Sequence, residues 1–389
     1  MSEPIMPEPI PPSGTVHWLG AGLSTGSGLR VLGDATDRLV LWARTERKAS
    51  DCLSRLGLTG RATAAGFSVP ALAAALRPGD VVVSMLPASQ HAGLVRLCVS
   101  HGAHFACSSY VSESILAEVP GAAQAGVVVL TEAGLDPGID HLLAHVLIAQ
   151  ARTAIGDGAA AADFTSYCGG VPAVPNAFRY RFSWAPRGVL SALREPASYV
   201  ADSERKQVRY PWEATERLAV NGEEFEAYPN RDSIGFIAQY GVPSDWQLRT
   251  FVRGTLRLDG WSDAWASVFA ELKDGDGDRV DELAKELAAK YPSTAADLDR
   301  VVLAVSLQVR SDERNWSGEY LLDLTGDQAE SAMARCVSLP LAFGVMQIKD
   351  GAMAPGLHRA AEEPEGAQRW LDFLREHGID CVFRGNAAV

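Results

Sequence analysis

A glycine-rich segment near the start of the chain has the spacing of a nucleotide-binding turn. Gly20 and Gly22 directly follow a predicted strand over 15–19, in a GxGxxxG pattern. Gly20 permits a tight turn, Gly22 lets a pyrophosphate approach the backbone, and the amides of a helix predicted over 23–32 would face the phosphate charge. We therefore expect a dinucleotide to contact Gly20, Gly22, Leu23, Ser24 and Thr25. A merely flexible Gly/Ser turn is the alternative interpretation.

The next predicted strand, over 38–43, ends in Arg44 and Thr45. NAD-dependent enzymes with this motif usually place Asp or Glu there to bind the ribose 2′-hydroxyl, whereas arginine suits a 2′-phosphate. The sequence therefore favours NADP, bound through Arg44 and Thr45. A surface arginine without this role, or use of both coenzymes, stays open.

Later arginines have the chemistry to bind carboxylates. Arg187 opens a predicted helix through Leu193, where a positive charge opposes the helix dipole, so another group should recruit it. That group is a substrate carboxylate or, alternatively, an ion-pair partner such as Glu195 or a carboxylate of another domain. The segment Asn230-Arg231-Asp232-Ser233 is expected to begin a helix whose polar N-terminus suits an anion.

A strand is predicted over 248–258, because apolar and polar residues alternate there. Arg249, Arg253 and Arg257 share one face of this strand. They either line a pocket for a polycarboxylate or form a solvated or subunit-facing surface with partners in the chain. Both alternatives stay open.

Composition excludes several functional classes. A net charge of −13 over 389 residues argues against nucleic acid or an anionic membrane as a partner. The six cysteines form no CxxC pair and no zinc-ligand spacing, which indicates no metal site and a reducing, intracellular compartment. No apolar run approaches the roughly 20 residues needed to cross a bilayer. No Ser–His–Asp or paired-carboxylate arrangement is evident either.

Apolar runs place these residues in an α/β fold. Buried parallel strands are predicted at 81–86, 104–107 and 127–130, with Asp136 as N-cap and Pro137 as the first residue of a helix that runs through Leu147. Further on, a strand at 162–167, a hairpin of 301–309 with 316–324 and a helix over 327–349 indicate a different unit. We expect a Rossmann-type doubly wound nucleotide domain plus an α+β domain for substrate binding and dimerisation, with a mixed or antiparallel sheet.

Five ordered segments carry a resemblance to a known family. They are Glu132–His141, Ser166–Gly170, Phe182–Leu190, Tyr228–Ser233 and Val252–Leu256. Together they resemble the NADP-dependent, glutamate-forming saccharopine dehydrogenases (saccharopine reductases). Two departures concern the substrate: Ala88 stands where the family's loop commonly has tyrosine, and the segment 171–181 is shorter than in relatives.

The resemblance implies oxidative cleavage of saccharopine to L-glutamate and 2-aminoadipate 6-semialdehyde, or the reverse, in a cytoplasmic homodimer of lysine metabolism. It places Cys168, Tyr110 and Ser109 near the reacting carbon. It implies that substrate contacts Arg187, Asn230, Arg231, Ser233, Ala88 and Ser89. It adds Leu86, Pro87, Ser108, Leu135, Asp136 and Pro137 to the cofactor contacts. Two alternatives remain, a different secondary amine such as a carboxylated polyamine precursor, and a non-catalytic NADP-binding scaffold.

Domain boundaries follow from these elements and the resemblance. We expect a mobile Pro-rich tail over 1–13, the NADP-binding domain over 14–133 and the substrate domain over 134–340. The resemblance further implies that a helical segment over 341–389 returns to the nucleotide domain.

Overall fold

A computed structural model describes residues 8, 10–294 and 297–386 and forms two compact units. Among these described residues, the first unit comprises those up to 139 together with 334–361, and the second comprises those of 140–333 together with 362–386. The segment that returns to the first unit therefore ends at 361. Residues 362–386 of the expected 341–389 segment belong to the second unit, and 387–389 lie outside the described residues.

The expected tail is only partly covered by the described residues, since 1–7 and 9 lie outside them. The amide of Ile10 donates to the carbonyl of Gly126 at 2.9 Å. The hydroxyl of Ser13 donates to Asp80 at 2.6 Å. Residues 10–13 are therefore held on the first unit, and for them the prediction of a mobile tail is wrong.

The first unit contains, within the described residues, a seven-stranded sheet with the order β15-β6-β5-β4-β1-β2-β3. All of its strand pairs are parallel. The strands are β1 (Thr15–Leu19), β2 (Arg38–Ala43), β3 (Thr63–Gly66), β4 (Val81–Ser84), β5 (His104–Cys107), β6 (Val128–Leu130) and β15 (Gly356–His358). Strand order reverses between β1 and β4, and ligands of such sheets bind beside the reversal at the carboxyl ends of the strands. The expected Rossmann-type sheet is confirmed.

Helices connect these strands. They are α1 (Ser27–Ala35), α2 (Glu46–Arg55), α3 (Val69–Ala75), the 3₁₀ turn η1 (Ala88–Gln90), α4 (His91–His101), α5 (Glu113–Leu116), α6 (Val119–Gln124) and α13 (Ala332–Lys349). Gly28 of α1 lies against α13, because a Cβ on Gly28 would be 1.9 Å from the carbonyl oxygen of Ser338. The Gly28 amide also donates to the Ser338 hydroxyl at 3.0 Å. Only glycine allows this approach of the two helices.

The second unit contains a mixed sheet in which the described residues form nine strands. The main path is β10-β11-β12-β7-β13-β14-β16; off this path, β8 pairs with β12, and β9 pairs with β8. Only the pair of β12 and β7 is parallel. The strands are β7 (Ala160–Pro172), β8 (Ala197–Ala201), β9 (Glu204–Val208), β10 (Glu216–Val220), β11 (Glu223–Pro229), β12 (Trp246–Leu258), β13 (Asp299–Arg310), β14 (Asn315–Thr325) and β16 (Val382–Asn386). The expected hairpin of β13 and β14 is confirmed, as is the mixed sheet.

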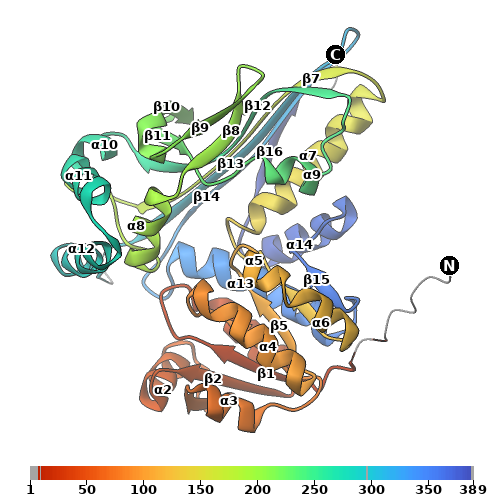
Figure 1. Cartoon of the computed structure of the whole chain (residues 1–389), viewed down its shortest axis with the longest axis vertical. Helices are drawn as coiled ribbons and strands as arrows, with labels where there is room; N and C mark the ends of the chain where they lie inside the picture. The colour runs from red at the N-terminus through yellow and green to blue at the C-terminus, as the bar shows by residue number, and fades with distance from the viewer. Residues whose placement is uncertain (1–7, 9, 295–296, 387–389) are drawn as a thin grey trace. The chain divides into compact units, whose positions relative to one another are not determined.

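Long and short helices flank this sheet (Figure 1). They are α7 (Ile139–Ile155), α8 (Pro186–Arg194), the 3₁₀ turn η2 (Pro211–Ala214), α9 (Gly235–Gln239), α10 (Trp261–Ala264), α11 (Ala266–Asp274), α12 (Gly277–Lys290) and α14 (Pro364–Glu376). Aromatic residues from the 178–182 loop, α10 and α11 form a buried core with α8 and α12.

Helix α13 begins at Ala332, whereas the sequence predicted a start at Asp327. The carboxylate of Asp299 accepts the amides of Ala332 and Met333 at 2.8 and 2.9 Å, so a distant side chain fixes this helix start. No helix in the part of the chain that the structure describes is long and apolar enough to span a bilayer.

Candidate functional site

The glycine-rich turn follows β1 and leaves room for a ligand at Gly22. A Cβ on Gly22 would meet no heavy atom within 4 Å. Gly20 has φ +115°, and a Cβ there would be 3.1 Å from the Cβ of Met85, which follows β4. The turn therefore lies at the strand-order reversal, where a pyrophosphate can approach the backbone.

Residues 23–25 lie in the turn and not in a helix, because α1 begins at Ser27. The expected helix start at Leu23 is therefore wrong. The Thr25 hydroxyl donates to the Gly20 carbonyl at 3.0 Å, and the indole of Trp18 donates to the same carbonyl at 3.1 Å. The buried Thr25 side chain thus stabilises the turn, while the side chain of Leu23 is exposed and that of Ser24 is half-buried.

Arg44 follows β2 at the carboxyl edge of the sheet. Its side chain is exposed and makes no ion pair with the residues that the structure describes. Thr45 caps α2, since its hydroxyl accepts the amide of Lys48 at 3.3 Å. The guanidinium of Arg44 is therefore available to a 2′-phosphate, whereas the hydroxyl of Thr45 already has a structural role.

The loop after β4 contains the expected contacts Leu86, Pro87, Ala88 and Ser89. The carbonyl of Leu86 lies 3.0 Å from Nε2 of His91. Burial lowers the pKa of His91, so this histidine is neutral at pH 7 and braces the loop. Ala88 and Ser89 lie in η1 with exposed side chains.

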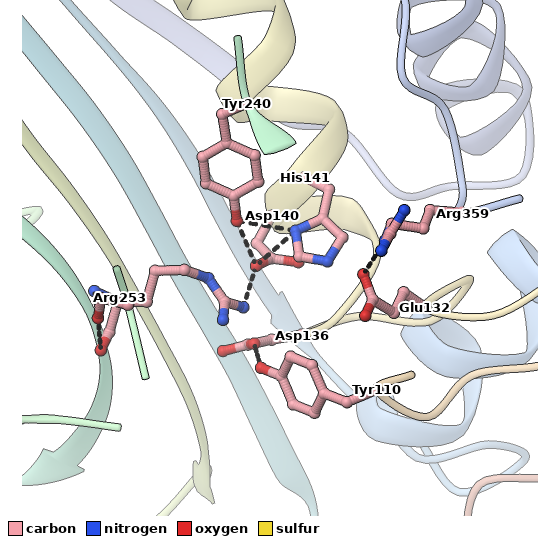
Figure 2. Close-up of polar contacts among 9 residues, drawn as sticks. Tyr110, Glu132, Asp136, Asp140, His141, Tyr240, Arg253 and Arg359 are labelled. Atoms are coloured by element: carbon pink, nitrogen blue, oxygen red, sulfur yellow. Dashed lines mark hydrogen bonds and ion pairs between the residues drawn. The ribbon is translucent and has the colours of Figure 1, made fainter. Parts of the chain in front are cut away.

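Tyr110 and Asp136 come together at the edge formed by β5 and β6. The hydroxyl of Tyr110 donates to Oδ1 of Asp136 at 2.6 Å (Figure 2). The Asp136–Pro137 peptide is cis, and α7 begins only at Ile139. The expected roles of Asp136 as N-cap and Pro137 as first helical residue are therefore wrong, and the Asp136 carboxylate faces Tyr110 instead.

The same edge is held by close backbone contacts. A Cβ on Gly134 would be 2.9 Å from the Cβ of Ser108, and the carbonyl of Ser109 accepts the amide of Glu132 at 3.0 Å. Glu132 also pairs with Arg359 at 3.3 Å (Figure 2). The first unit thus gathers the predicted residues from the ends of β1, β2, β4, β5 and β6 along one edge, where a dinucleotide fits.

In the second unit, Arg257 of β12 is buried in an aromatic surround. Its side chain is 7% exposed, and its Cζ lies 4.9 Å from the ring centre of Tyr180 and 5.5 Å from those of Tyr228 and Trp261. Burial raises the pKa of Tyr180 to about 12 and raises that of Tyr228 as well. Both phenols are therefore neutral at pH 7 and leave the positive charge of Arg257 uncompensated.

Arg257 has no carboxylate within ion-pair distance among the described residues. Its cross-strand neighbour is Glu226. The Glu226 carboxylate instead accepts the amides of Gly260 and Ser262 at 2.8 Å each and so caps α10. Burying a cation without a direct anionic partner is unfavourable. Together with the indole N–H of Trp261, which is buried without an acceptor, this arrangement fits a carboxylate ligand.

The other two arginines of the strand do have partners. Arg253 is 3% exposed and donates from Nη2 to Oδ2 of Asp140 at 2.6 Å. Arg249 pairs with Asp163 of β7. The three arginines of the expected face therefore differ. Arg249 and Arg253 each pair with a carboxylate, whereas Arg257 has no carboxylate partner within the described part of the chain.

Asp140 is the centre of a buried polar cluster at the start of α7 (Figure 2). Its Oδ2 lies 3.3 Å from Nδ1 of His141 and accepts the Tyr240 hydroxyl at 3.4 Å. Burial opposes ionisation of Asp140, but the charges of His141 and Arg253 outweigh it and hold the pKa of the carboxyl well below its ordinary value. Asp140 is therefore a buried carboxylate that is fully engaged within the second unit.

Cys168 lies in the middle of β7 and is buried. It pairs with Thr255 of β12 and Leu303 of β13 in the sheet register. Because paired residues of neighbouring strands face the same way, Cys168 shares a sheet face with Thr255 and Arg257. This face of the second unit thus brings together one predicted residue, Cys168, and one that the sequence left undecided, Arg257.

The structure favours the ion-pair alternative for Arg187. Its side chain is 67% exposed and pairs with Asp281 of α12. The partner is neither Glu195 nor a carboxylate of the other unit, and it explains why an arginine is tolerated at the start of α8. Substrate binding by Arg187 has no support in this geometry.

The segment Asn230–Ser233 does not begin a helix, so that expectation is wrong. It forms a loop between β11 and α9, with Arg231 at φ +55°. The Ser233 hydroxyl is fully buried and accepts the Arg253 amide at 2.9 Å, which makes it a structural contact. The side chain of Asn230 makes no hydrogen bond within the described residues and is available to a ligand.

Comparisons with known proteins show what the chain is similar to. The model of the saccharopine dehydrogenase NADP binding domain matches residues 16–130, and that of the saccharopine dehydrogenase C-terminal domain matches residues 134–379. A saccharopine dehydrogenase [NADP(+), L-glutamate-forming] of Pyricularia oryzae is 35% identical over 253 residues, which cover 64% of this chain and 55% of that protein. An alpha-aminoadipic semialdehyde synthase of Arabidopsis thaliana is 39% identical over 47% of this chain and 18% of its own length. The chain thus spans about half or less of these curated relatives.

Two solved structures resemble the fold. The apo saccharopine dehydrogenase (L-Glu forming) from Saccharomyces cerevisiae has a TM-score of 0.79 at 25% identity, over 96% of this chain and 100% of that one. A homospermidine synthase from Legionella pneumophila in complex with NAD has a TM-score of 0.63 at 11% identity, over 98% and 93%. At that identity the second likeness shows the fold alone.

Proposed function

The chain belongs to the saccharopine dehydrogenase family, and we propose that it catalyses NADP-dependent oxidative cleavage of saccharopine to L-glutamate and 2-aminoadipate 6-semialdehyde, or the reverse. The observation that carries this proposal is Arg257, a buried guanidinium without a direct carboxylate partner among the residues that the structure describes. Saccharopine has three carboxylates around one secondary amine, so a substrate of this class supplies the missing anion.

The first unit has residues that fit the coenzyme. Gly22 leaves space for a pyrophosphate, and exposed Arg44 offers a guanidinium to the 2′-phosphate. Bound NADP would supply a hydride acceptor for the carbon of saccharopine that was the lysine ε-carbon. The parallel sheet holds these two residues at its carboxyl edge, where they would orient the coenzyme.

Tyr110 and Asp136 are the groups of the first unit to which we assign acceptance of the substrate's amine proton. Loss of the hydride and of the amine proton gives a substrate imine, which water hydrolyses to the amine of glutamate and the semialdehyde. The Asp136 carboxylate is fixed by the Tyr110 hydroxyl at 2.6 Å, and a carboxylate so placed can accept a proton. We assign it this role and assign Tyr110 the role of orienting it.

The second unit supplies the carboxylate contacts. Arg257 binds one substrate carboxylate, with the Trp261 indole as a second donor. Asn230 and Arg231 bind another, as the sequence predicted. Cys168 and Ser109 stay predicted neighbours of the reacting carbon, and Ala88 and Ser89 stay predicted substrate contacts.

The test is reduction of NADP at alkaline pH, followed by the absorbance of NADPH, with saccharopine and with carboxyspermidine-type amines as parallel substrates. We expect turnover with saccharopine and a strong preference over the polyamine. Preference for the polyamine would move the chain to another amine substrate. No turnover with either would indicate an NADP-binding scaffold.

We further infer a homodimer with a cytoplasmic location. Val382 and Phe383 of the edge strand β16 have large apolar side chains that are exposed, which supports pairing of this edge with a second copy. Light scattering coupled to size-exclusion chromatography tests the dimer, and cell fractionation tests the location.

A further inference from the structure

Arg253 holds the Asn230–Ser233 loop through its backbone. The carbonyl of Arg253 accepts the Asn230 amide at 2.8 Å and the Ser233 hydroxyl at 3.5 Å. The Arg253 amide donates to the Ser233 hydroxyl at 2.9 Å. The loop is thus attached at both of its ends to one residue of β12.

Between these attachments the loop has an unusual backbone. Arg231 adopts a left-handed φ of +55°, which non-glycine residues rarely adopt unless their surroundings impose it. The carbonyl of Arg231 accepts the Ser198 amide of β8, and the Ser233 amide donates back to the Ser198 carbonyl, both at 2.8 Å. The direction of the Arg231 side chain therefore depends on how firmly β12 and β8 hold the loop.

The side chain of Arg253 is fixed in turn by a buried carboxylate. Its Nη2 donates to Asp140 at 2.6 Å (Figure 2). The ring of Phe236 in α9 stacks on the guanidinium, with its centre 3.9 Å from Cζ. The Tyr240 hydroxyl joins the same carboxylate and lies 2.8 Å from Nδ1 of His141. Phe236 and Tyr240 belong to the segment that continues the loop, so this cluster fixes the loop at its far end as well.

We propose that the Asp140–Arg253 ion pair is a positioning device that holds the Asn230–Ser233 loop in the conformation that binds a substrate carboxylate. Arg253 and Asp140 are positioning residues, since both are buried and engaged with each other. The proposal rests on the proposed function, because the loop is the predicted carboxylate contact.

A purely structural ion pair is the competing explanation. Such pairs contribute little net stability, and apolar residues of similar volume often replace them without loss. A planar guanidinium held by a carboxylate and an aromatic ring instead fixes orientation, and lysine cannot reproduce that geometry. Substituting lysine therefore keeps the charge and removes the orientation.

The experiment compares Arg253→Lys and Ser233→Ala with the unchanged enzyme. Arg300→Lys is the matched control, because Arg300 also pairs with an aspartate of the sheet, Asp323, at 2.6 Å. Arg300 lies on the sheet face opposite to that of Arg253, near Phe225. For each protein, KM and kcat for saccharopine, NADP affinity and amide hydrogen exchange over residues 230–240 are measured.

We expect Arg253→Lys and Ser233→Ala to raise the KM for saccharopine at least tenfold, with kcat and NADP affinity changed less than threefold and faster exchange over 230–240. Arg300→Lys should leave all of these unchanged. If the protein without substitutions is active, and Arg253→Lys and Ser233→Ala both have its KM for saccharopine, the positioning role is overturned. If the unchanged enzyme does not turn over saccharopine, the proposed function fails, and exchange over 230–240 alone decides whether the ion pair orders the loop. Ser233→Ala leaves the buried charges intact, so it decides the outcome should Arg253→Lys fail to fold.

Discussion

The guanidinium of Arg257 lies 4.9 Å above the ring of Tyr180, and the pKa of that tyrosine is raised to about 12 by burial. A neutral ring therefore faces a positive charge, because Tyr180 does not ionise near pH 7 to compensate it. The second unit keeps this arrangement although Glu226 lies opposite Arg257 in the strand register. The Glu226 carboxylate caps α10 instead. A charge left uncompensated in this way is expected where a ligand supplies the counter-charge.

Arg257→Met should separate stability from activity. Removing an uncompensated buried charge should raise the thermal midpoint of unfolding. Loss of a charged hydrogen bond to a substrate carboxylate should remove about 1.5–3 kcal/mol of transition-state stabilisation. This loss corresponds to a kcat/KM for saccharopine that is roughly 10- to 150-fold lower. Calorimetry and initial rates measure the two effects.

Arg187→Ala distinguishes the two arginines, because loss of an exposed pair should change kcat/KM less than about threefold. The opposite result would return the carboxylate-binding role to Arg187.

Arg44→Ser should weaken NADP binding but not NAD binding. The side chain makes no ion pair within the described residues, so its removal costs contacts to the coenzyme and none to the fold. One charged contact to a 2′-phosphate corresponds to about 1.5–3 kcal/mol, so the Kd for NADP should rise roughly 10- to 150-fold. Isothermal titration with both coenzymes measures this. Arg47→Ser, which removes a similarly exposed arginine beside Asp51, is the control. Equal loss for NADP and NAD would exclude recognition of the 2′-phosphate by Arg44.

Asp136→Asn should reduce kcat more than Tyr110→Phe does. The amide keeps the hydrogen bond to Tyr110 but cannot accept the amine proton, and general base catalysis contributes about 10²–10⁴ in rate. Tyr110→Phe removes only the group that orients the carboxylate, so a smaller loss is expected. Single-turnover kinetics with saccharopine measure the loss of rate in both variants. A kcat for Asp136→Asn within threefold of the unchanged enzyme would show that another group takes the proton.

His145 should make the second unit less stable as the pH falls. Burial, with the charge of His141, lowers the pKa of His145 from 6.5 to about 4. The unfolded chain therefore takes up a proton near pH 6.5, whereas the folded chain takes it up only near pH 4. The unfolding free energy should fall between about pH 6.5 and 4, by up to about 3 kcal/mol at about 1.4 kcal/mol per unit.

Urea unfolding of the unchanged protein and of His145→Leu across this range measures the effect. His91 and His104, whose pKa values burial also lowers, add slopes of the same sign to both proteins. The difference between the two proteins therefore isolates His145. Parallel curves for the two proteins would contradict the assignment.

The sequence was informative wherever the signal is local. The apolar run at 81–86 becomes β4, the run at 104–107 becomes β5, and the alternation at 248–258 becomes most of β12. Gly20 and Gly22 lie at the strand-order reversal, as the pattern predicted. In each case neighbouring residues alone determine the conformation, through burial on both faces or through the freedom of glycine.

Local patterns were misleading where distant partners decide. Asp136-Pro137 matches a helix start in sequence, yet Tyr110 engages the carboxylate and α7 begins at Ile139. Arg249, Arg253 and Arg257 are equivalent by alternation. They differ because Asp163 and Asp140 pair with the first two from 86 and 113 positions away. No spacing in the sequence contains that information.

The most direct test of the account is saccharopine-dependent reduction of NADP by the purified chain and by Arg257→Met under identical conditions. We predict that the unchanged chain produces NADPH together with glutamate and 2-aminoadipate semialdehyde. We predict that Arg257→Met binds NADP with the same affinity but requires far more saccharopine for the same rate. Equal saccharopine kinetics in the two proteins, or no glutamate from the unchanged chain, would contradict the account.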